Sequence, residues 1–409
     1  MVDNKQGPLA GIGVLAGTPG SAYSKMGPNS LYGALMESHP GRSYVEQWNI
    51  NVQRQLSASL TAIIGYIGSH GVHQLNRGDD GNLVIPTMTS AGYLWPYNPT
   101  RQDLRINPKL GPIRYMLYNN DTSYHSFQVN VQKRMSRSFQ FGAAYSYSRG
   151  MDSSSGTIAG DSFSNSVTTW FWFDPKITHA RSDFDVTHTA VLNGIWQVPG
   201  PRAGLRRLVL GGWEMGSIFK MNSGVPTTPL IGGDAIGAQN AGSDPYSIPD
   251  RVPGCDGVNS NFKSNPGGVF LGYINTGCFT LPKATPEIAS RCVPFVGSGT
   301  LANPQFPGTC SNLLGNAGRN SVIGPPLVNL DFSLYKNFAV QKISESFNVQ
   351  FRAEFFNILN HPNFGPPLPF FNSGQAQIFK LNGTLSGGGG LQYAVTQPRD
   401  IQFALKVIW

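Results

Sequence analysis

The chain has 409 residues and a formal net charge of +8, yet only 13% of its residues are charged, against about 25% in ordinary globular domains. It contains no run of about 18 apolar residues, so we expect no transmembrane helix. Lys and Arg are scattered, without a basic run or a basic helix, and this distribution argues against a nucleic-acid partner.

Segments in which apolar and polar residues alternate with a period of two predict β-strands. In the segment Phe347–Asn357, aromatic and aliphatic residues would lie on one face of the strand, and Arg352 and Glu354 on the opposite, polar face. The predicted strands, in chain order, are Gln47–Leu56, Leu60–Gly68, Ser126–Arg134, Phe139–Ser148, His188–Val198, Leu208–Asn222, Val328–Lys336, Phe347–Asn357 and Ile401–Trp409.

The connections between these segments alternate between short and long. The long ones cover about residues 69–125, 149–187, 223–327 and 358–397. Polar, structureless loops of this length are uncommon inside a compact soluble domain. Short turns at one end and long outer loops at the other are typical of transmembrane barrels. We therefore predict an all-β fold, an antiparallel up-and-down transmembrane β-barrel with long extracellular loops.

The last nine residues form the clearest of the predicted strands. Phe403, Leu405, Val407 and Trp409 fall on one face, and the final residue is aromatic. Such a strand resembles the closing strand of a bacterial outer-membrane β-barrel, whose apolar face meets lipid and whose aromatic end lies at the interface. In that family this strand looks like the signal for the barrel-assembly machinery. The resemblance implies the same role for these four residues.

The number of predicted strands is odd. With the C-terminus in the periplasm, counting back places residues 1–43 outside the cell as a loop or remnant. Bacterial single-chain barrels have an even number of strands and both termini in the periplasm. A tenth strand would have to come from Pro8–Ala16 or from elsewhere, and Met1–Lys5 does not begin a signal peptide. We expect residues 44–409 to be the C-terminal part of a larger barrel.

Several stretches carry a resemblance to one family when they are taken together. They resemble the C-terminal barrel of TonB-dependent outer-membrane receptors, in the subgroup with an N-terminal carboxypeptidase-regulatory-like domain, over about residues 40–409. The stretches are SYVEQWNINVQRQL, GYIGSHG, SYHSFQVNVQKR, GGWEMGSIFKMNSGVP, LGNAGRNSVIGPPLVNLDFSLYKNF and FRAEFFNILNHPNFGPP.

The resemblance implies a fold and a function. Members of the family have a barrel of about 22 strands, of which this chain would supply about nine or ten. They also have an N-terminal plug and a TonB box, and they import large nutrients with energy from the inner membrane. Neither a plug nor a TonB box is recognisable in this sequence. TonB is therefore expected as a partner only through a missing N-terminal plug, and the large ligand is unknown.

All four cysteines, Cys255, Cys278, Cys292 and Cys310, lie in the longest predicted loop. Their spacing contains no C-x-x-C pair, which argues against zinc. Because compartments outside the inner membrane are oxidising, we predict two disulfides. We favour the sequential pairing, Cys255 with Cys278 and Cys292 with Cys310, since short loops close at the lowest entropic cost. Free thiols in an irregular loop are the alternative.

Signals for catalysis are weak. Gly160-Asp161-Ser162 lacks the G-x-S-x-G pattern of a hydrolase elbow, and His70 and His73 form an isolated H-x-x-H without further ligands. We expect no enzyme, no cofactor and no metal site. Arg352 and Glu354 are candidate polar residues of the lumen, either in an interior network or as ligand contacts.

Three functional hypotheses follow. The favoured one is part of an outer-membrane receptor for active uptake, with membrane lipid and the barrel-assembly machinery as partners. The second is a structural or adhesive outer-membrane barrel that does not transport. The third is a soluble, secreted β-protein.

Overall fold

The computed structural model describes most, but not all, of the chain. The segment Pro8–Ala16, most of residues 1–43, the tripeptide Gly160–Ser162 and the terminal Trp409 lie outside the described part, and the predictions made for them stay predictions. The described residues are 33–78, 80–97, 104–107, 110–156, 171–201, 204–238, 247–259, 261, 263–264, 270–339, 347–367, 377–386, 391 and 394–408.

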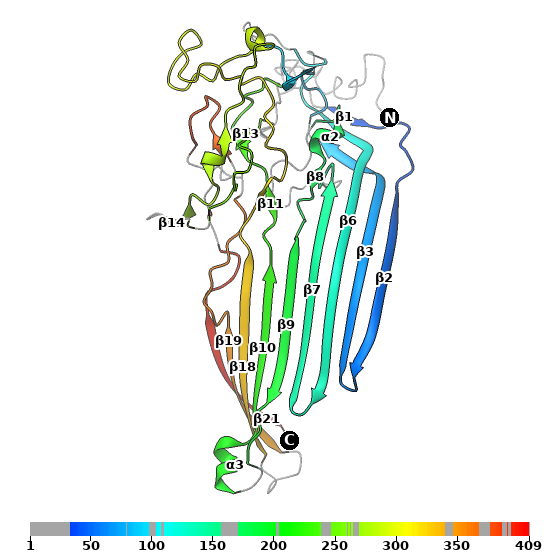
Figure 1. Ribbon diagram of the computed structural model, residues 1–409, viewed down its shortest axis with the longest axis vertical. Helices are drawn as coiled ribbons and strands as arrows, with labels where there is room; N and C mark the ends of the chain where they lie inside the picture. The colour runs from blue at the N-terminus through cyan, green and yellow to red at the C-terminus, as the bar shows by residue number, and fades with distance from the viewer. Residues whose placement is uncertain are drawn as a thin grey trace, which may run out of the picture.

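Nine long strands lie side by side in one antiparallel sheet (Figure 1). Two short strands extend it: β1 (Gly33–Met36) pairs in parallel with β6, and β8 (Ala180–Arg181) pairs with the end of β7. The order across the sheet is β2 (Tyr44–Ser57), β3 (Leu60–Gly78), β6 (Ile113–Ser136), β7 (Phe139–Asp152), β9 (His188–Gln197), β10 (Trp213–Asn222), β18 (Leu327–Ala339), β19 (Asn348–Phe356) and β21 (Asp400–Ile408).

The predicted all-β antiparallel fold is confirmed, and each of the nine predicted segments contains a strand. The largest boundary errors were in three strands. Strands β3 and β6 continue about ten residues into the segment predicted as loop 69–125, because they stay paired beyond the region where apolar residues alternate. The predicted strand Leu208–Asn222 begins later, at Trp213, because Leu205–Leu210 forms the short helix α3.

The nine long strands each present a mainly apolar and a mainly polar face, and the pairing register keeps like faces together across the sheet. Val52 pairs with Ile64, for example, and Ile64 in turn pairs with Val129. On the other face Asn51 pairs with Gly65, and Gly65 with Gln128. A slip of one residue in any pair would mix the two faces, so the alternation in the sequence determines the register.

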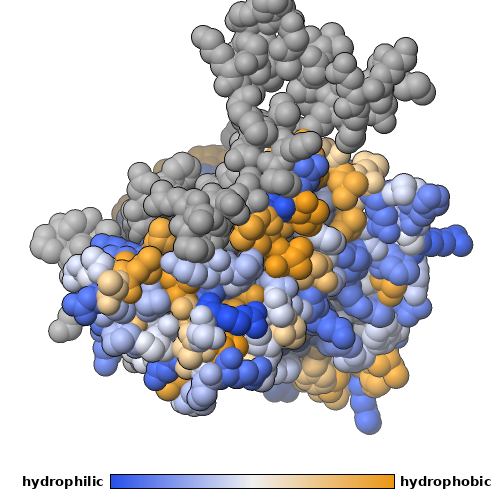
Figure 2. Space-filling model, turned by 90° about the horizontal axis from the view of Figure 1, so that it is seen from above, coloured by the Kyte–Doolittle hydropathy of each residue, from blue (hydrophilic) through white to orange (hydrophobic). Residues whose placement is uncertain are grey.

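The connections of the sheet differ at its two ends (Figure 1). At the lower end, neighbouring strands are joined by short links such as the turn at residues 137–138, and by the link that carries α3. At the upper end lie the long connections, which contain the remaining short elements. We call this upper layer the cap. Seen from above, the cap presents hydrophobic patches on a largely hydrophilic surface (Figure 2).

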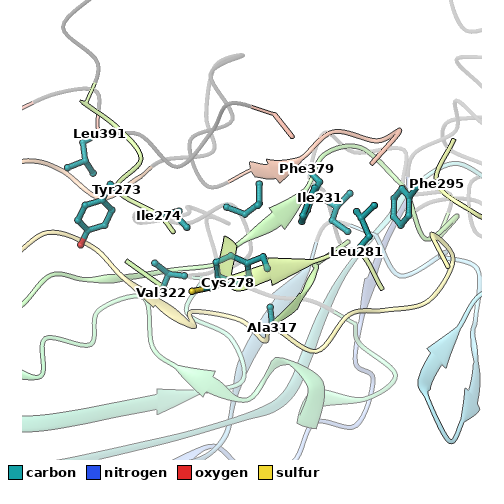
Figure 3. Packing of buried hydrophobic residues seen from close by; sticks show 12 residues of the cluster. Ile231, Tyr273, Ile274, Cys278, Leu281, Phe295, Ala317, Val322, Phe379 and Leu391 are labelled. Atoms are coloured by element: carbon teal, nitrogen blue, oxygen red, sulfur yellow. The ribbon is translucent and has the colours of Figure 1, made fainter. Parts of the chain in front are cut away.

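The cap contains the buried hydrophobic core of the described structure. One cluster gathers Leu83, Trp95, Phe171 and Leu230 from three different connections. A second cluster surrounds Ile231 and includes Tyr273, Phe295 and Phe379 (Figure 3). These connections were predicted as long polar loops, and the buried clusters within them were not predicted. The clusters form because residues far apart in the chain bury one another there.

The sheet has two open edges among the described residues, at β2 and at β21, which do not pair with each other. The barrel is therefore not closed within this part of the chain. No helix among the described residues is long and apolar enough to cross a bilayer.

Candidate functional site

The apolar face of the sheet is the first surface with functional meaning. It carries large side chains that nothing in the described structure covers, including Ile50, Val52, Ile64, Phe127, Leu192, Phe403 and Leu405. A contiguous patch of this size is unfavourable in water but suits hydrocarbon. The shortest spanning strands, β19 and β21, have nine residues each, which is enough to cross a bilayer when tilted. We call this the outward face.

Aromatic residues lie at both ends of the outward face. Trp196 and Trp213 lie near the short links, where Lys336 Nζ is 5.2 Å from the centre of the Trp213 ring. Trp48 lies toward the cap and is the register partner of Gly68 on the neighbouring strand β3. A Cβ at Gly68 would be 2.3 Å from Trp48 Cε2, so this glycine lets the indole lie over the neighbouring strand. Trp and Tyr favour the two interfaces of a bilayer.

The candidate assembly signal lies on the outward face of the last strand. Phe403 and Leu405 are each 69% exposed and Val407 is 43% exposed, while Phe403 stacks on Phe351 of β19. Trp409, the fourth candidate, is outside the described residues. Recognition by the assembly machinery stays a prediction.

The candidate lumen residues Arg352 and Glu354 both lie on the polar face, as their alternation predicts. Arg352 Nε donates a hydrogen bond to Gln350 Oε1 at 2.6 Å, and its guanidinium lies 5.3 Å from the centre of the Tyr335 ring. The Tyr335 hydroxyl donates to Glu354 Oε1 at 3.3 Å. Gln350 Nε2 also donates to Asn337 Oδ1 at 2.9 Å. These contacts form an interior polar network, and a ligand role for Arg352 or Glu354 stays a prediction.

A cavity of about 510 Å³ lies where β6, β7 and β9 reach the cap. Ten of its sixteen lining residues carry a hydroxyl group, and two, Asp152 and Asp185, carry a carboxylate. Both carboxylates already accept hydrogen bonds: Asp152 from Ser155 Oγ at 2.7 Å, and Asp185 from the Gly150 N–H at 2.7 Å. We call this space the hydroxyl cavity. Sequence reasoning missed it, although the run Ser153–Ser155 was a visible signal.

A second cavity adjoins the hydroxyl cavity along the polar face of β2, β3 and β6. It has a volume of about 680 Å³ and shares Ser69 and Tyr124 with its neighbour. Side-chain amides dominate its polar lining, from Gln47, Asn49, Asn51, Gln128 and Asn130. We call it the amide cavity.

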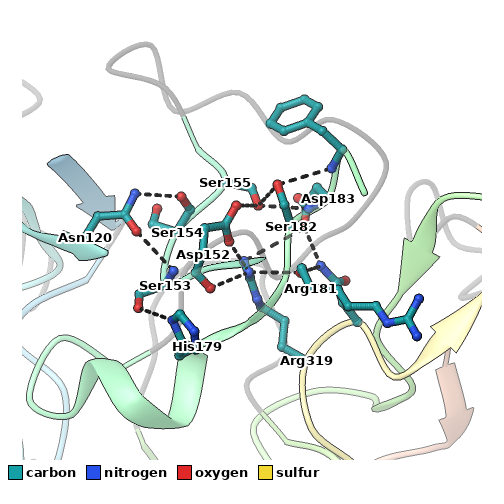
Figure 4. Close-up of polar contacts among 12 residues, drawn as sticks. Asn120, Asp152, Ser153, Ser154, Ser155, His179, Arg181, Ser182, Asp183 and Arg319 are labelled. Carbon is teal, nitrogen blue, oxygen red and sulfur yellow. Dashed lines mark hydrogen bonds and ion pairs between the residues drawn. The ribbon is translucent and has the colours of Figure 1, made fainter. Parts of the chain in front are cut away.

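A buried polar cluster fastens the cap to the end of the sheet (Figure 4). Arg319, from the longest connection, is fully buried and forms ion pairs with Asp152 of β7 and, at 3.9 Å, with Asp183. Its Nη2 also donates to the backbone oxygen of Arg181 at 3.2 Å. Asn320 Nδ2 donates to Asp183 Oδ1 at 2.7 Å. We call this cluster the latch. It could not be predicted from the sequence, because its members lie far apart in the chain.

Two disulfides and a tyrosine hydrogen bond hold the connections of the cap together. The structure joins Cys255 to Cys278 and Cys292 to Cys310, which is the sequential pairing. Tyr93 donates a hydrogen bond to Asp174 Oδ2 at 2.6 Å, and this bond, with a smaller contribution from desolvation, raises the pKa of Tyr93 to about 12.

The two histidines of the H-x-x-H segment contact other groups. His70 Nε2 lies 3.0 Å from Asp121 Oδ1, whereas His73 Nδ1 lies 3.3 Å from the backbone oxygen of Arg42. Over the described ranges, no group of three or more His, Cys, Asp or Glu side chains is arranged to hold a metal ion.

Residues 4–402 match the family described as outer membrane beta barrel domain. Among solved structures, the chain is similar to the outer membrane transporter YddB from Escherichia coli, with 11% identity and a TM-score of 0.40 over 93% of this chain. It is also similar to the FrpB iron transporter from Neisseria meningitidis, with 9% identity and a TM-score of 0.35 over 91%. The chain spans about a third of these transporters, 34% and 32% of their lengths. No curated protein matches it.

Proposed function

This chain belongs to the outer membrane β-barrel domain family, whose place is the bacterial outer membrane, and we propose that it forms the barrel portion of a TonB-dependent receptor. Its function would be the active uptake of a large nutrient. The stretches that resemble TonB-dependent receptors support this assignment over other barrels. In this proposal the chain is not an enzyme and does not bind nucleic acid.

One observation carries the proposal. The sheet separates an outward apolar face from a polar face, and the polar face holds two adjoining cavities, of which the hydroxyl cavity reaches the cap. A wall of this kind can line an aqueous path while the other face rests in lipid. Solute recognition at the cavities would precede passage along the polar face.

The proposal also assigns an orientation and partners. The short links and the C-terminus face the periplasm, and the cap faces the exterior, since bacterial barrels have short periplasmic turns and long outer loops. Lipid covers the outward face. The barrel-assembly machinery binds the last strand, and TonB acts through a plug supplied with the barrel.

Growth of a gene-deletion strain tests the function. We expect slower growth on at least one nutrient too large for porins, in a panel of oligosaccharides, ferric siderophores and cobalamin. Disrupting TonB should cause the same defect, and restoring the gene should remove it. A growth defect in the gene-deletion strain that disruption of TonB does not reproduce would contradict TonB dependence.

A second candidate, a structural or adhesive barrel, is favoured by the cap, which has its own core and two disulfides. It predicts normal growth of the deletion strain on every nutrient in the panel. Surface attachment or resistance to detergent would change instead.

A further inference from the structure

The hydroxyl cavity has a lining that selects for one class of solute. Among its described lining residues there is no Lys or Arg, although the whole chain contains 30 of them. Its two carboxylates belong to the fold: Asp152 pairs with Arg319, and Asp185 lies 3.4 Å from Arg181 Nη1. The described lining therefore offers an anionic solute no cation of its own, so charge complementarity does not favour an anion.

Several hydroxyl groups on the cavity wall are available to a solute. Within the part of the chain that the structure describes, the side chains of Ser69, Ser146 and Thr189 have no hydrogen-bond partner in the protein. Ser146 and Thr189 are register partners on β7 and β9, so their hydroxyls are neighbours. A hydroxyl both donates and accepts a hydrogen bond, which matches the hydroxyls of a sugar.

Two aromatic rings complete the wall. Tyr124 is 37% exposed and Phe184 is 52% exposed, and both line the hydroxyl cavity. Gly150 is the register partner of Tyr124 and places no side chain beside the ring, where a Cβ would lie 4.0 Å from Tyr124 Cδ2. Aromatic rings offer a flat apolar face that suits the C–H face of a sugar ring.

The adjoining amide cavity indicates an elongated solute. The two cavities share Ser69 and Tyr124, and neither lining contains a basic side chain among the described residues. From these observations we propose that the hydroxyl cavity and the amide cavity together bind a neutral oligosaccharide, with Tyr124 as the stacking residue at their junction. This proposal rests on the proposed uptake function and names its substrate class.

Binding to a printed array of neutral and uronic-acid oligosaccharides tests the proposal, with the full-length protein in detergent. We expect binding to at least one neutral oligosaccharide and weaker binding to its acidic counterpart. Tyr124→Ala should weaken neutral binding about tenfold, since a lost aromatic contact costs about that factor. Tyr147→Ala is the matched control, because Tyr147 lies on the outward face of β7, away from both cavities. It should leave binding unchanged.

A second variant separates recognition from folding. Thr189→Lys adds a cation to the hydroxyl cavity and should shift the preference toward acidic oligosaccharides, an outcome that misfolding cannot produce. Binding of acidic glycans alone, binding of no glycan, or equal losses in Tyr124→Ala and Tyr147→Ala would overturn the proposal. Uptake of a nutrient other than a glycan would leave the transport function intact and remove only the substrate class. Glycan binding without any TonB-linked growth defect would support the substrate class and contradict the proposed transport function.

Discussion

At the scale of single residues, the two faces of each strand meet different surroundings, and neighbouring positions therefore tolerate opposite changes. Val129 and Gln128 are adjacent on β6. Val129 pairs with Ile64 and Tyr145 on the outward face, whereas Gln128 pairs with Gly65 and Ser146 on the polar face. Introducing the same side chain at both positions therefore compares its effect on stability in lipid with its effect in the lumen.

We expect Val129→Arg to destabilise the protein by about 2–4 kcal/mol, because a charge would enter the hydrocarbon layer, and Gln128→Arg to cost much less. The measurement is urea-dependent unfolding of the full-length protein in phospholipid vesicles. Equal losses at the two positions would show that the assignment of the faces is wrong.

Tyr93 gives the cap a pH dependence. Its pKa in the folded protein, about 12, exceeds the ordinary value of 10.0. The stabilisation from the bond to Asp174 is therefore complete below pH 10 and is lost as the pH rises toward 12. Protease resistance of the cap should fall over this interval. Tyr93→Phe should lower resistance at pH 8 and make the additional loss above pH 10 disappear; parallel profiles for the two proteins would refute the role of this phenol.

Removing Arg319 should loosen the cap. Arg319→Met leaves Asp152 and Asp183 as buried carboxylates without their cation, and breaking such a pair costs about 3–5 kcal/mol. Hydrogen exchange at residues 150–156 should accelerate. Arg291→Met, at an exposed position in the same connection, serves as the control and should change exchange there little. Unchanged exchange in Arg319→Met would mean that the latch does not hold the cap.

At the scale of elements, the cap and the sheet are stabilised differently. The sheet depends on paired strands and lipid, whereas the cap depends on buried side chains and two disulfides. Damage to the cap should therefore leave the sheet in place.

Removing either disulfide should act on the cap alone. Replacing Cys255 and Cys278 together by Ser, or Cys292 and Cys310 together, should cost about 2–4 kcal/mol, since loops of 23 and 18 residues would no longer be closed. Trypsin should cut the cap faster while the heat-dependent gel shift of the barrel stays the same. Labelling intact cells with a thiol reagent provides the reference: strong labelling without reductant would exclude the bridges.

The elements that could be predicted from the sequence are those with a local signal. Alternation within ten residues identified β7 and β21, because each strand carries its own two-faced pattern. The latch was not predictable, because Arg319 and Asp152 are 167 residues apart and neither lies in a sequence motif that indicates an ion pair. The hydroxyl cavity was missed for the same reason, since its residues come from several strands and become neighbours only through the register.

At the scale of the whole molecule, the two open edges point the same way. Both β2 and β21 run from the cap toward the short links (Figure 1). Pairing them directly would give a parallel contact in an otherwise antiparallel wall. A closed antiparallel barrel therefore needs an odd number of further strands between them.

We expect residues 33–409 alone, produced with a signal peptide, not to show heat-modifiable migration on a gel. Unpaired backbone groups in lipid cost several kcal/mol each. Supplying the complete barrel should restore the shift. A compact, heat-modifiable species from this segment alone would show that the two edges find another way to close.

The composition of the cap core also implies an order of steps in the maturation of the protein. Leu83, Phe171 and Leu230 come from three connections separated by membrane-crossing strands, so they can meet only after those strands have paired. Each disulfide, in contrast, closes within one connection and needs no partner from elsewhere. We therefore expect newly exported chains to become oxidised in the periplasm first and protease-resistant only later, after insertion. Alkylation of pulse-labelled cells would reveal this oxidised, protease-sensitive intermediate as a distinct early stage.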